Sequence, residues 1–186
     1  MIPQSGLGRV LFVLLIALTI GQWLLPLAFY DALPRRVPVH FDLSGNPDRW
    51  SERGGWEMWV GPITATVMAI LCIVLLKFPG AYNVPRKAEI ALLPPAARAR
   101  LHDLMREMML AIFVCIGILM GGLNLFTLMI ATGAALRTPW PLIVLLVTAP
   151  LALAIYYLNR IARAADEAKT MAGRQTVTSG ISARLP

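Results

Sequence analysis

The stretch that decides the fold is VLFVLLIALTIGQWLLPLAFY, residues 10–30, in which no side chain carries a charge. A run of about 20 apolar residues, rising 1.5 Å per residue in a helix, crosses the hydrocarbon core of a bilayer. Because lipid offers no hydrogen-bond partner to free backbone groups, such a segment must be helical. The run is long and no A-x-A-type site follows it, so we expect an uncleaved membrane span.

Three further runs of this kind extend over residues 58–78, 108–131 and 140–158. The chain is 58% hydrophobic and 15% charged, whereas soluble domains carry roughly 25% charged residues. The sequence therefore predicts one all-α membrane domain over residues 1–186, an integral four-helix bundle. Cys72 and Cys115 lie inside apolar runs, and we expect two buried thiols that act as small hydrophobes.

The positions of the basic residues predict which side of the membrane each loop occupies. Of the 17 Lys and Arg residues, the first and third loops hold only Arg35, Arg36, Arg49, Arg53 and Arg137. The positive-inside rule then places both termini in the cytoplasm and the protein in a cytoplasmic (inner) membrane. We assign the net charge of +7 to this topology and to contact with membrane lipids, and expect no nucleic-acid partner.

The segments outside the spans differ in their predicted position and structure. Residues 31–57 form an outward loop, and residues 79–107 form a cytoplasmic segment that contains LLPPAARARLHDLM, residues 92–105. Apolar residues recur there at helical spacing, so we expect an amphipathic helix that leads into the third span and lies at the interface or docks a cytoplasmic partner. Residues 165–186 are polar and rich in small residues, which predicts a flexible cytoplasmic tail.

The third span carries three residues suited to helix packing. Gly117 and Gly121 form a small-xxx-small pair that lets another helix approach closely. We favour a contact within the chain over formation of an oligomer, which the same pair could also support. Asn124 lies deeper in the span and needs a partner on another helix.

The outward loop contains VPVHFDLSGNPDRW, residues 37–50, the most polar passage near the spans. Asp42, Ser44, Asn46 and Asp48 alternate as in half of an EF-hand, but the glycine is at the fourth position and Arg53 stands at the twelfth. A zinc site lacks ligands, because the second histidine, His102, lies on the other side of the membrane. No triad pattern surrounds Ser44. We expect no metal, no cofactor and no enzymatic activity.

A structural interpretation accounts for most of this passage. Alternating Val37, Val39 and Phe41 suit a short extended segment, and SGNPD is a turn in which Gly45 supplies a positive φ. The loop is therefore predicted to be ordered. Its candidate functional or structural residues are His40, Phe41, Gly45, Pro47, Asp48 and Trp50.

The passage LPRRVPVHFDLSGNPDRWSER, residues 33–53, resembles the signature of the "domain of unknown function 1648" family, roughly L-P-x-x-[IV]-P-x-H-[FW]-x-x-x-G-x-P-D-x-[WF]-x-x-[KR]. The matching residues are Leu33, Pro34, Val37, Pro38, His40, Phe41, Gly45, Pro47, Asp48, Trp50 and Arg53. The resemblance implies a bacterial membrane protein with no established catalytic residues. The same domain forms the N-terminal part of SdpI-type immunity proteins, which have more spans than four, protect against a membrane-active toxin and can hold a repressor at the membrane.

Three functions follow as hypotheses. The first is a non-enzymatic binding, regulatory or immunity-like protein whose outward loop or cytoplasmic helix meets a protein or peptide partner. The second is a small transporter or lipid-handling subunit with a polar path around Asn124. The third is a metal-dependent membrane enzyme that uses His40, Asp42 and Asp48.

Overall fold

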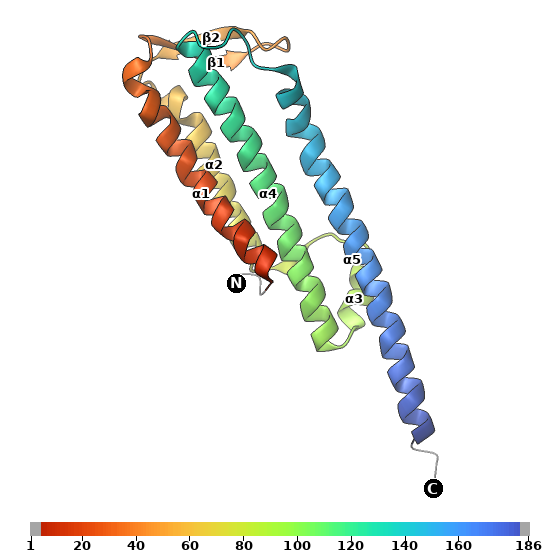
Figure 1. Ribbon diagram of the computed structural model, residues 1–186. Coiled ribbons are helices and arrows are strands. Elements are labelled where there is room, and N and C mark those ends of the chain that lie inside the picture. The colour runs from red at the N-terminus through yellow and green to blue at the C-terminus, as the bar shows by residue number, and fades with distance from the viewer. Residues whose placement is uncertain (1–4, 183–186) are drawn as a thin grey trace.

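Four long helices dominate the structure, a computed structural model that describes the backbone of residues 5–182 and the side chains of residues 5–172 (Figure 1). In chain order, the helices and strands are α1 (Gly6–Phe29), β1 (Arg36–Phe41), β2 (Pro47–Glu52), α2 (Val60–Leu75), α3 (Lys87–Leu92), α4 (Pro95–Ala131) and α5 (Trp140–Ser182). Short 3-10 turns follow α1 at Tyr30–Ala32, precede α2 at Trp56–Trp59 and precede α3 at Pro79–Ala81.

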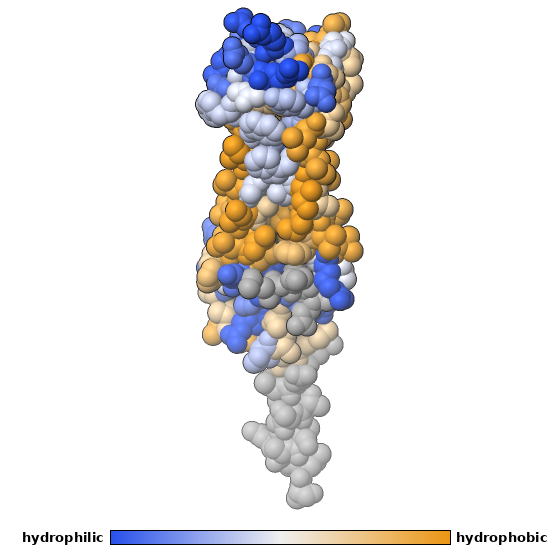
Figure 2. All heavy atoms as spheres, turned by 90° about the vertical axis from the view of Figure 1, so that its left-hand side faces the viewer, coloured by the Kyte–Doolittle hydropathy of each residue, from blue (hydrophilic) through white to orange (hydrophobic). Residues whose placement is uncertain are grey.

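The four long helices confirm the predicted membrane spans. With their adjoining turns, Gly6–Ala32, Trp56–Leu75, Pro95–Ala131 and Trp140–Ala172 are each long and apolar enough to cross a bilayer. Figure 2 shows the belt that results: apolar side chains cover the middle of the molecule, and hydrophilic side chains lie above and below it. The chain thus has the surface of a multi-pass membrane protein.

The helices are less evenly packed than the predicted four-helix bundle. α4 is the central helix: α1 and α2 pack against it and against each other, whereas α5 packs chiefly on α4. Figure 1 shows α4 between the α1–α2 pair and α5. Much of α5 therefore presents apolar side chains such as Val147 and Leu151 to the surroundings, as a lipid-facing helix does.

The contact between α1 and α4 depends on small residues. A Cβ atom on Gly117 would lie 3.4 Å from Leu18 Cδ1, and one on Gly121 would lie 3.3 Å from Gln22 Nε2. Gln22 donates from Nε2 to the carbonyl of Gly117 at 3.3 Å and accepts from Asn124 Nδ2 at 3.1 Å. Asn124 thus has the interhelical partner that its place in an apolar span requires.

The end of the molecule opposite the hairpin holds the largest group of buried side chains. We call this end the base: the start of α1, residues 77–94, residues 95–107 of α4 and residues 158–172 of α5. Leu101 and Met105 pack there with Ile161 of α5, and Tyr82 covers them. Tyr82 donates its hydroxyl to the carbonyl of Leu75 at 2.8 Å, and burial raises the pKa of this phenol to about 12. The predicted amphipathic segment does continue into the third span, because α4 is one helix from Pro95 to Ala131.

The chain is mostly helical, as predicted, but the outward loop folds as an antiparallel pair of strands. The predicted flexible tail, residues 165–186, begins inside α5, which continues to Ser182. Its flexibility stays a prediction, and residues 183–186 lie outside the described residues. Alanine-rich sequence favours the helix. Two ion pairs to the α3 region add to it, Arg86 with Asp166 and Glu89 with Lys169.

A larger residue at Gly117 should separate α1 from α4. We expect Gly117→Leu to lower the free energy of unfolding by about 1–3 kcal/mol, because the close approach to Leu18 leaves no room for the side chain. Gly21→Leu is the matched control, since a Cβ on Gly21 meets nothing within 4 Å. Thermal unfolding of both variants in detergent measures the difference, and equal midpoints would contradict the packing described above.

Candidate functional site

The hairpin of β1 and β2 lies across the ends of the helices (Figure 1). Its antiparallel register pairs Arg36 with Glu52, Val37 with Ser51, Pro38 with Trp50, His40 with Arg49 and Phe41 with Pro47, and irregularities flank His40. A two-stranded sheet has only edge strands. Pro38 and Pro47 are tolerated there because no further strand requires the backbone N–H that proline lacks. The predicted extended segment is therefore the first strand of a hairpin.

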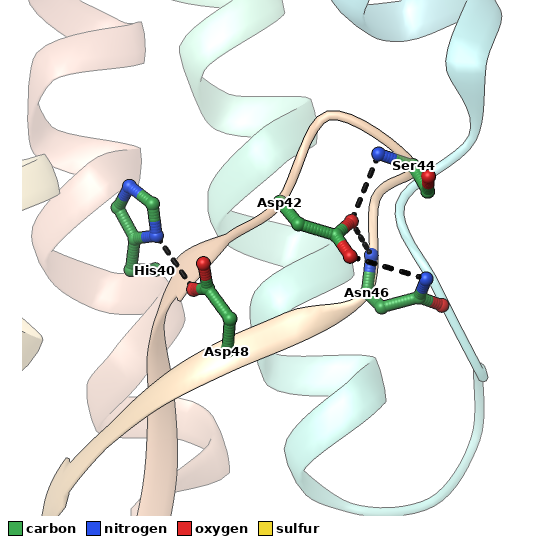
Figure 3. A network of polar contacts seen from close by, with 5 residues as sticks. All are labelled: His40, Asp42, Ser44, Asn46 and Asp48. Atoms are coloured by element: carbon green, nitrogen blue, oxygen red, sulfur yellow. Dashed lines mark hydrogen bonds and ion pairs between the residues drawn. The ribbon is translucent and has the colours of Figure 1, made fainter.

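The turn of the hairpin is organised by one carboxylate. Asp42 Oδ1 accepts from the backbone N–H groups of Ser44 at 2.8 Å and Asn46 at 2.9 Å, and Asp42 Oδ2 accepts from Asn46 Nδ2 at 3.4 Å (Figure 3). Hydrogen bonds, first from the backbone of Asn46, lower the pKa of this exposed carboxyl. Gly45 closes the turn with a φ of 83°.

The tip of the hairpin is attached to the connection between α4 and α5. Thr138 donates its backbone N–H to the carbonyl of Gly45 at 3.0 Å, and Thr138 is only 3% exposed. A Cβ on Gly45 would lie 2.5 Å from the carbonyl oxygen of Thr138, so only glycine allows this approach. The tip therefore reaches across the molecule to the start of α5.

The underside and the entry of the hairpin are attached to α1 and α4. Val37 and Leu33 are each 3% exposed and pack with Leu128 of α4. Arg53 donates from Nη1 to the carbonyl of Leu33 at 3.0 Å, and its guanidinium lies over the ring of Tyr30, 5.3 Å from the centroid. These contacts close the loop where it leaves α1 and rejoins the chain before α2, so Leu33, Val37 and Arg53 serve to hold the hairpin in place.

Three motif residues, His40, Asp48 and Trp50, form the exposed part of the hairpin. His40 Nδ1 lies 2.6 Å from Asp48 Oδ1, and the two side chains keep 58% and 44% of their surface exposed. Figure 3 shows the two groups pointing toward each other from the two strands. Trp50 is 47% exposed, whereas Phe41 and Pro47 are half-buried. The structure thus brings His40, Asp48 and Trp50 onto one ordered hairpin.

A small cavity of about 240 Å³ lies beneath the hairpin. Phe41 and Val37 form its upper wall, and Asn124 and Thr127 of α4 contribute polar atoms. Thr127 donates its hydroxyl to the carbonyl of Leu123 at 2.9 Å, and Asn124 donates to Gln22 as described above. The polar side chains of this cavity are therefore already hydrogen-bonded.

The geometry gives the metal hypothesis no ligand set. Asp42 faces N–H donors within the turn, and it does not join His40 and Asp48 (Figure 3). In the part of the chain that the structure describes, no three His, Cys, Asp or Glu side chains are grouped as metal ligands. His102 lies in the base, at the other end of the molecule from His40.

Three residues that sequence reasoning missed hold important positions. Gln22 is 2% exposed and joins α1 to α4; a glutamine within an apolar run was the available signal. Thr138 receives the tip of the hairpin, and no local pattern indicated it. Glu107 is 5% exposed in the base, at the last position before the apolar part of α4.

The comparisons with known proteins agree with the motif. Residues 17–66 match the family described as "Domain of unknown function (DUF1648)". The matched region runs from the middle of α1 through the hairpin into the start of α2, so it contains both strands and parts of two helices. The resemblance predicted from residues 33–53 is confirmed.

The chain is also similar to an archaeal protein. The chain is 34% identical over 76 residues to an uncharacterised protein of Archaeoglobus fulgidus. The aligned part covers 40% of this chain and 40% of that protein, so the chain spans less than half the length of the relative it matches. No solved structure matches the chain.

The glycine at the tip can be tested by a pair of alanine variants. Gly133→Ala, at a φ of 78° with open space around its Cβ, should cost about 1 kcal/mol of unfolding free energy. Gly45→Ala adds the clash with Thr138, and we expect a total of about 3 kcal/mol. The midpoint of thermal unfolding should therefore be lower for Gly45→Ala than for Gly133→Ala. The reverse order would argue against the attachment of the tip.

The turn should loosen in acid. Because the folded-state pKa of Asp42 is lowered, its contribution to stability is complete above the ordinary pKa of the carboxyl and disappears as the pH falls through the lowered value. A nitroxide attached at Leu43→Cys, with Cys72 and Cys115 replaced by alanine, should become more mobile over that range. Asp42→Asn cannot titrate, so its nitroxide mobility should not change with pH in this range.

Proposed function

We propose that this chain is a non-enzymatic binding or regulatory membrane protein whose hairpin is the recognition surface for a protein or peptide partner. The observation that carries the proposal is a difference in burial among the motif residues. Leu33, Val37 and Gly45 are buried, while His40, Asp48 and Trp50 are exposed on the same hairpin. The first group fixes the hairpin and leaves the second available.

The exposed group has the properties of a binding surface. An indole supplies a large apolar contact area together with one hydrogen-bond donor. The imidazole and the carboxylate hold each other in place at 2.6 Å, so little conformational entropy is lost when a partner binds them. Interfaces rely on a few residues of this kind, with tryptophan prominent among them.

We propose further that the hairpin faces outward and the base faces the cytoplasm of a bacterial inner membrane. The start of α1 and the end of α5 lie at the same end of the molecule, opposite the hairpin (Figure 1). The excess of Lys and Arg at that end supports the cytoplasmic side under the positive-inside rule. An immunity-like role, in which the partner is a membrane-active peptide, rests on the family resemblance.

The transporter hypothesis receives less support from the described residues. Within the spans, Thr19 donates its hydroxyl to the carbonyl of Leu15, and Thr66 donates to the carbonyl of Pro62. Asn124 donates to Gln22 Oε1, and Gln22 donates to the carbonyl of Gly117. The first two bonds lie within one helix and the last two join α1 to α4, so these four side chains provide no line of free polar groups.

Photocrosslinking in the native host tests the binding proposal. With benzoylphenylalanine at Arg49, we expect a protein or peptide adduct in membranes of living cells. The triple variant His40→Ala, Asp48→Ala, Trp50→Ala should reduce the adduct about tenfold, corresponding to about 1.4 kcal/mol of binding free energy.

The control variant removes two other exposed side chains of the same hairpin, Leu43→Ala and Glu52→Ala, and should leave the adduct unchanged. Membrane accumulation and the thermal midpoint of each variant must equal those of the parent. Equal adduct yields from the triple and the control variant would overturn the proposed role of His40, Asp48 and Trp50.

A further inference from the structure

A large cavity lies in the base and has no part in the proposed function of the hairpin. It is a cleft of about 920 Å³ between the start of α1, α4 and α5, a size that suits a headgroup-sized ligand. Its polar lining consists of Ser5, Arg100, His102, Asp103, Arg106, Glu107, Arg160, Arg163 and Glu167.

Two arginines of the cleft are available for an anion. Arg106 is engaged, since Nη1 contacts Asp103 at 2.8 Å and Nε donates to the carbonyl of Leu76 at 3.1 Å. For Arg100 and Arg163, by contrast, residues 5–172 provide no ion pair within 4.0 Å and no side-chain hydrogen bond. Arginine binds phosphate oxygens through several N–H donors at once.

A buried carboxylate faces the same space. Glu107 is 5% exposed and receives no hydrogen bond from residues 5–172, and its one ion pair within 4.0 Å among these residues is with Arg160 Nη1, at 3.9 Å. No fully buried side-chain oxygen of the described residues lacks a partner, so the carboxylate oxygens of Glu107 must open into the cleft that it lines. A largely buried carboxylate without a hydrogen-bond donor lowers the free energy of unfolding. An ammonium group would supply that donor.

The depth of the cleft indicates where such a ligand comes from. Glu107 directly precedes Met108, where the apolar part of α4 begins, and hydrophilic residues appear just below the apolar belt at this end (Figure 2). This is the level of lipid headgroups. We propose that the cleft binds the phosphoethanolamine headgroup of a phosphatidylethanolamine lipid, with its phosphate on Arg100 and Arg163 and its ammonium on Glu107.

The mixed charge of the lining distinguishes this ligand from a purely anionic lipid. The cleft holds four arginines together with the carboxylates of Asp103, Glu107 and Glu167. A phosphatidylglycerol headgroup would satisfy the arginines but would offer no positive charge to Glu107. The start of α1, capped by Ser5, adds the partial positive charge of a helix N-terminus to the lining.

Native mass spectrometry of the full chain with defined lipids tests the proposal. The parent should retain one phosphatidylethanolamine about tenfold more strongly than one phosphatidylglycerol. Arg100→Gln with Arg163→Gln should weaken phosphatidylethanolamine retention about tenfold, while Lys77→Gln with Lys87→Gln, which removes the same charge from the base outside the cleft, should not change it. Glu107→Gln should abolish the preference between the two lipids and leave phosphatidylglycerol retention unchanged.

Two further measurements complete the test. The first identifies the source of the ligand, and the second uses the unaltered chain, so that misfolding of a variant cannot affect it. Soluble glycerophosphoethanolamine should fail to displace the bound lipid; displacement at equal concentration would show a free phosphate ester as the ligand and overturn the lipid assignment. A photoactivatable phosphatidylethanolamine with its reactive group in the headgroup, added to the unaltered chain, should label residues 99–107 and 160–167. Labelling spread evenly over the base, or equal retention by both double variants, would overturn the site.

Discussion

The bilayer supplies no hydrogen-bond partners, and this constraint shapes the whole molecule. Every backbone group within the apolar belt must be satisfied inside a helix, so the chain places its strands and loops only at the two ends. The same constraint explains why Gln22 and Asn124 bond to each other across α1 and α4. It also explains why a hairpin with two prolines lies on the helix ends, where its unpaired edges can meet water.

The hairpin is held at three places along its length. Leu33 and Val37 pack onto Leu128 at one side, Arg53 closes the loop against the end of α1, and Gly45 meets Thr138 at the far tip. Because these contacts involve α1, α4 and the start of α5, they fix the hairpin relative to the helices on both sides of α4. The exposed residues His40, Asp48 and Trp50 thereby gain a defined position.

Much of the architecture could be predicted from the sequence, because span length and apolar composition are local properties. The four spans, the continuous entry of residues 95–107 into α4 and the positive φ of Gly45 are such cases. The features that local sequence does not indicate depend on contacts between distant segments. The helical continuation of α5 past Ala165 involves ion pairs with Arg86 and Glu89, and the attachment of the tip involves Thr138, about 90 residues away from Gly45 in the chain. The pairing of His40 with Asp48 likewise required the register of the strands, which the sequence motif alone does not state.

Residues 36–52 form a folded hairpin that is fixed to the helix ends. Hydrogen–deuterium exchange of the protein in lipid nanodiscs tests this arrangement, because exchange reports the stability of individual backbone hydrogen bonds. We expect slow exchange at Asp42, Asn46 and Thr138, whose N–H groups are bonded to Asn46, Asp42 and Gly45 respectively. Exchange of these three amides at the rate of an unstructured loop, while the amides of α4 remain protected, would contradict it.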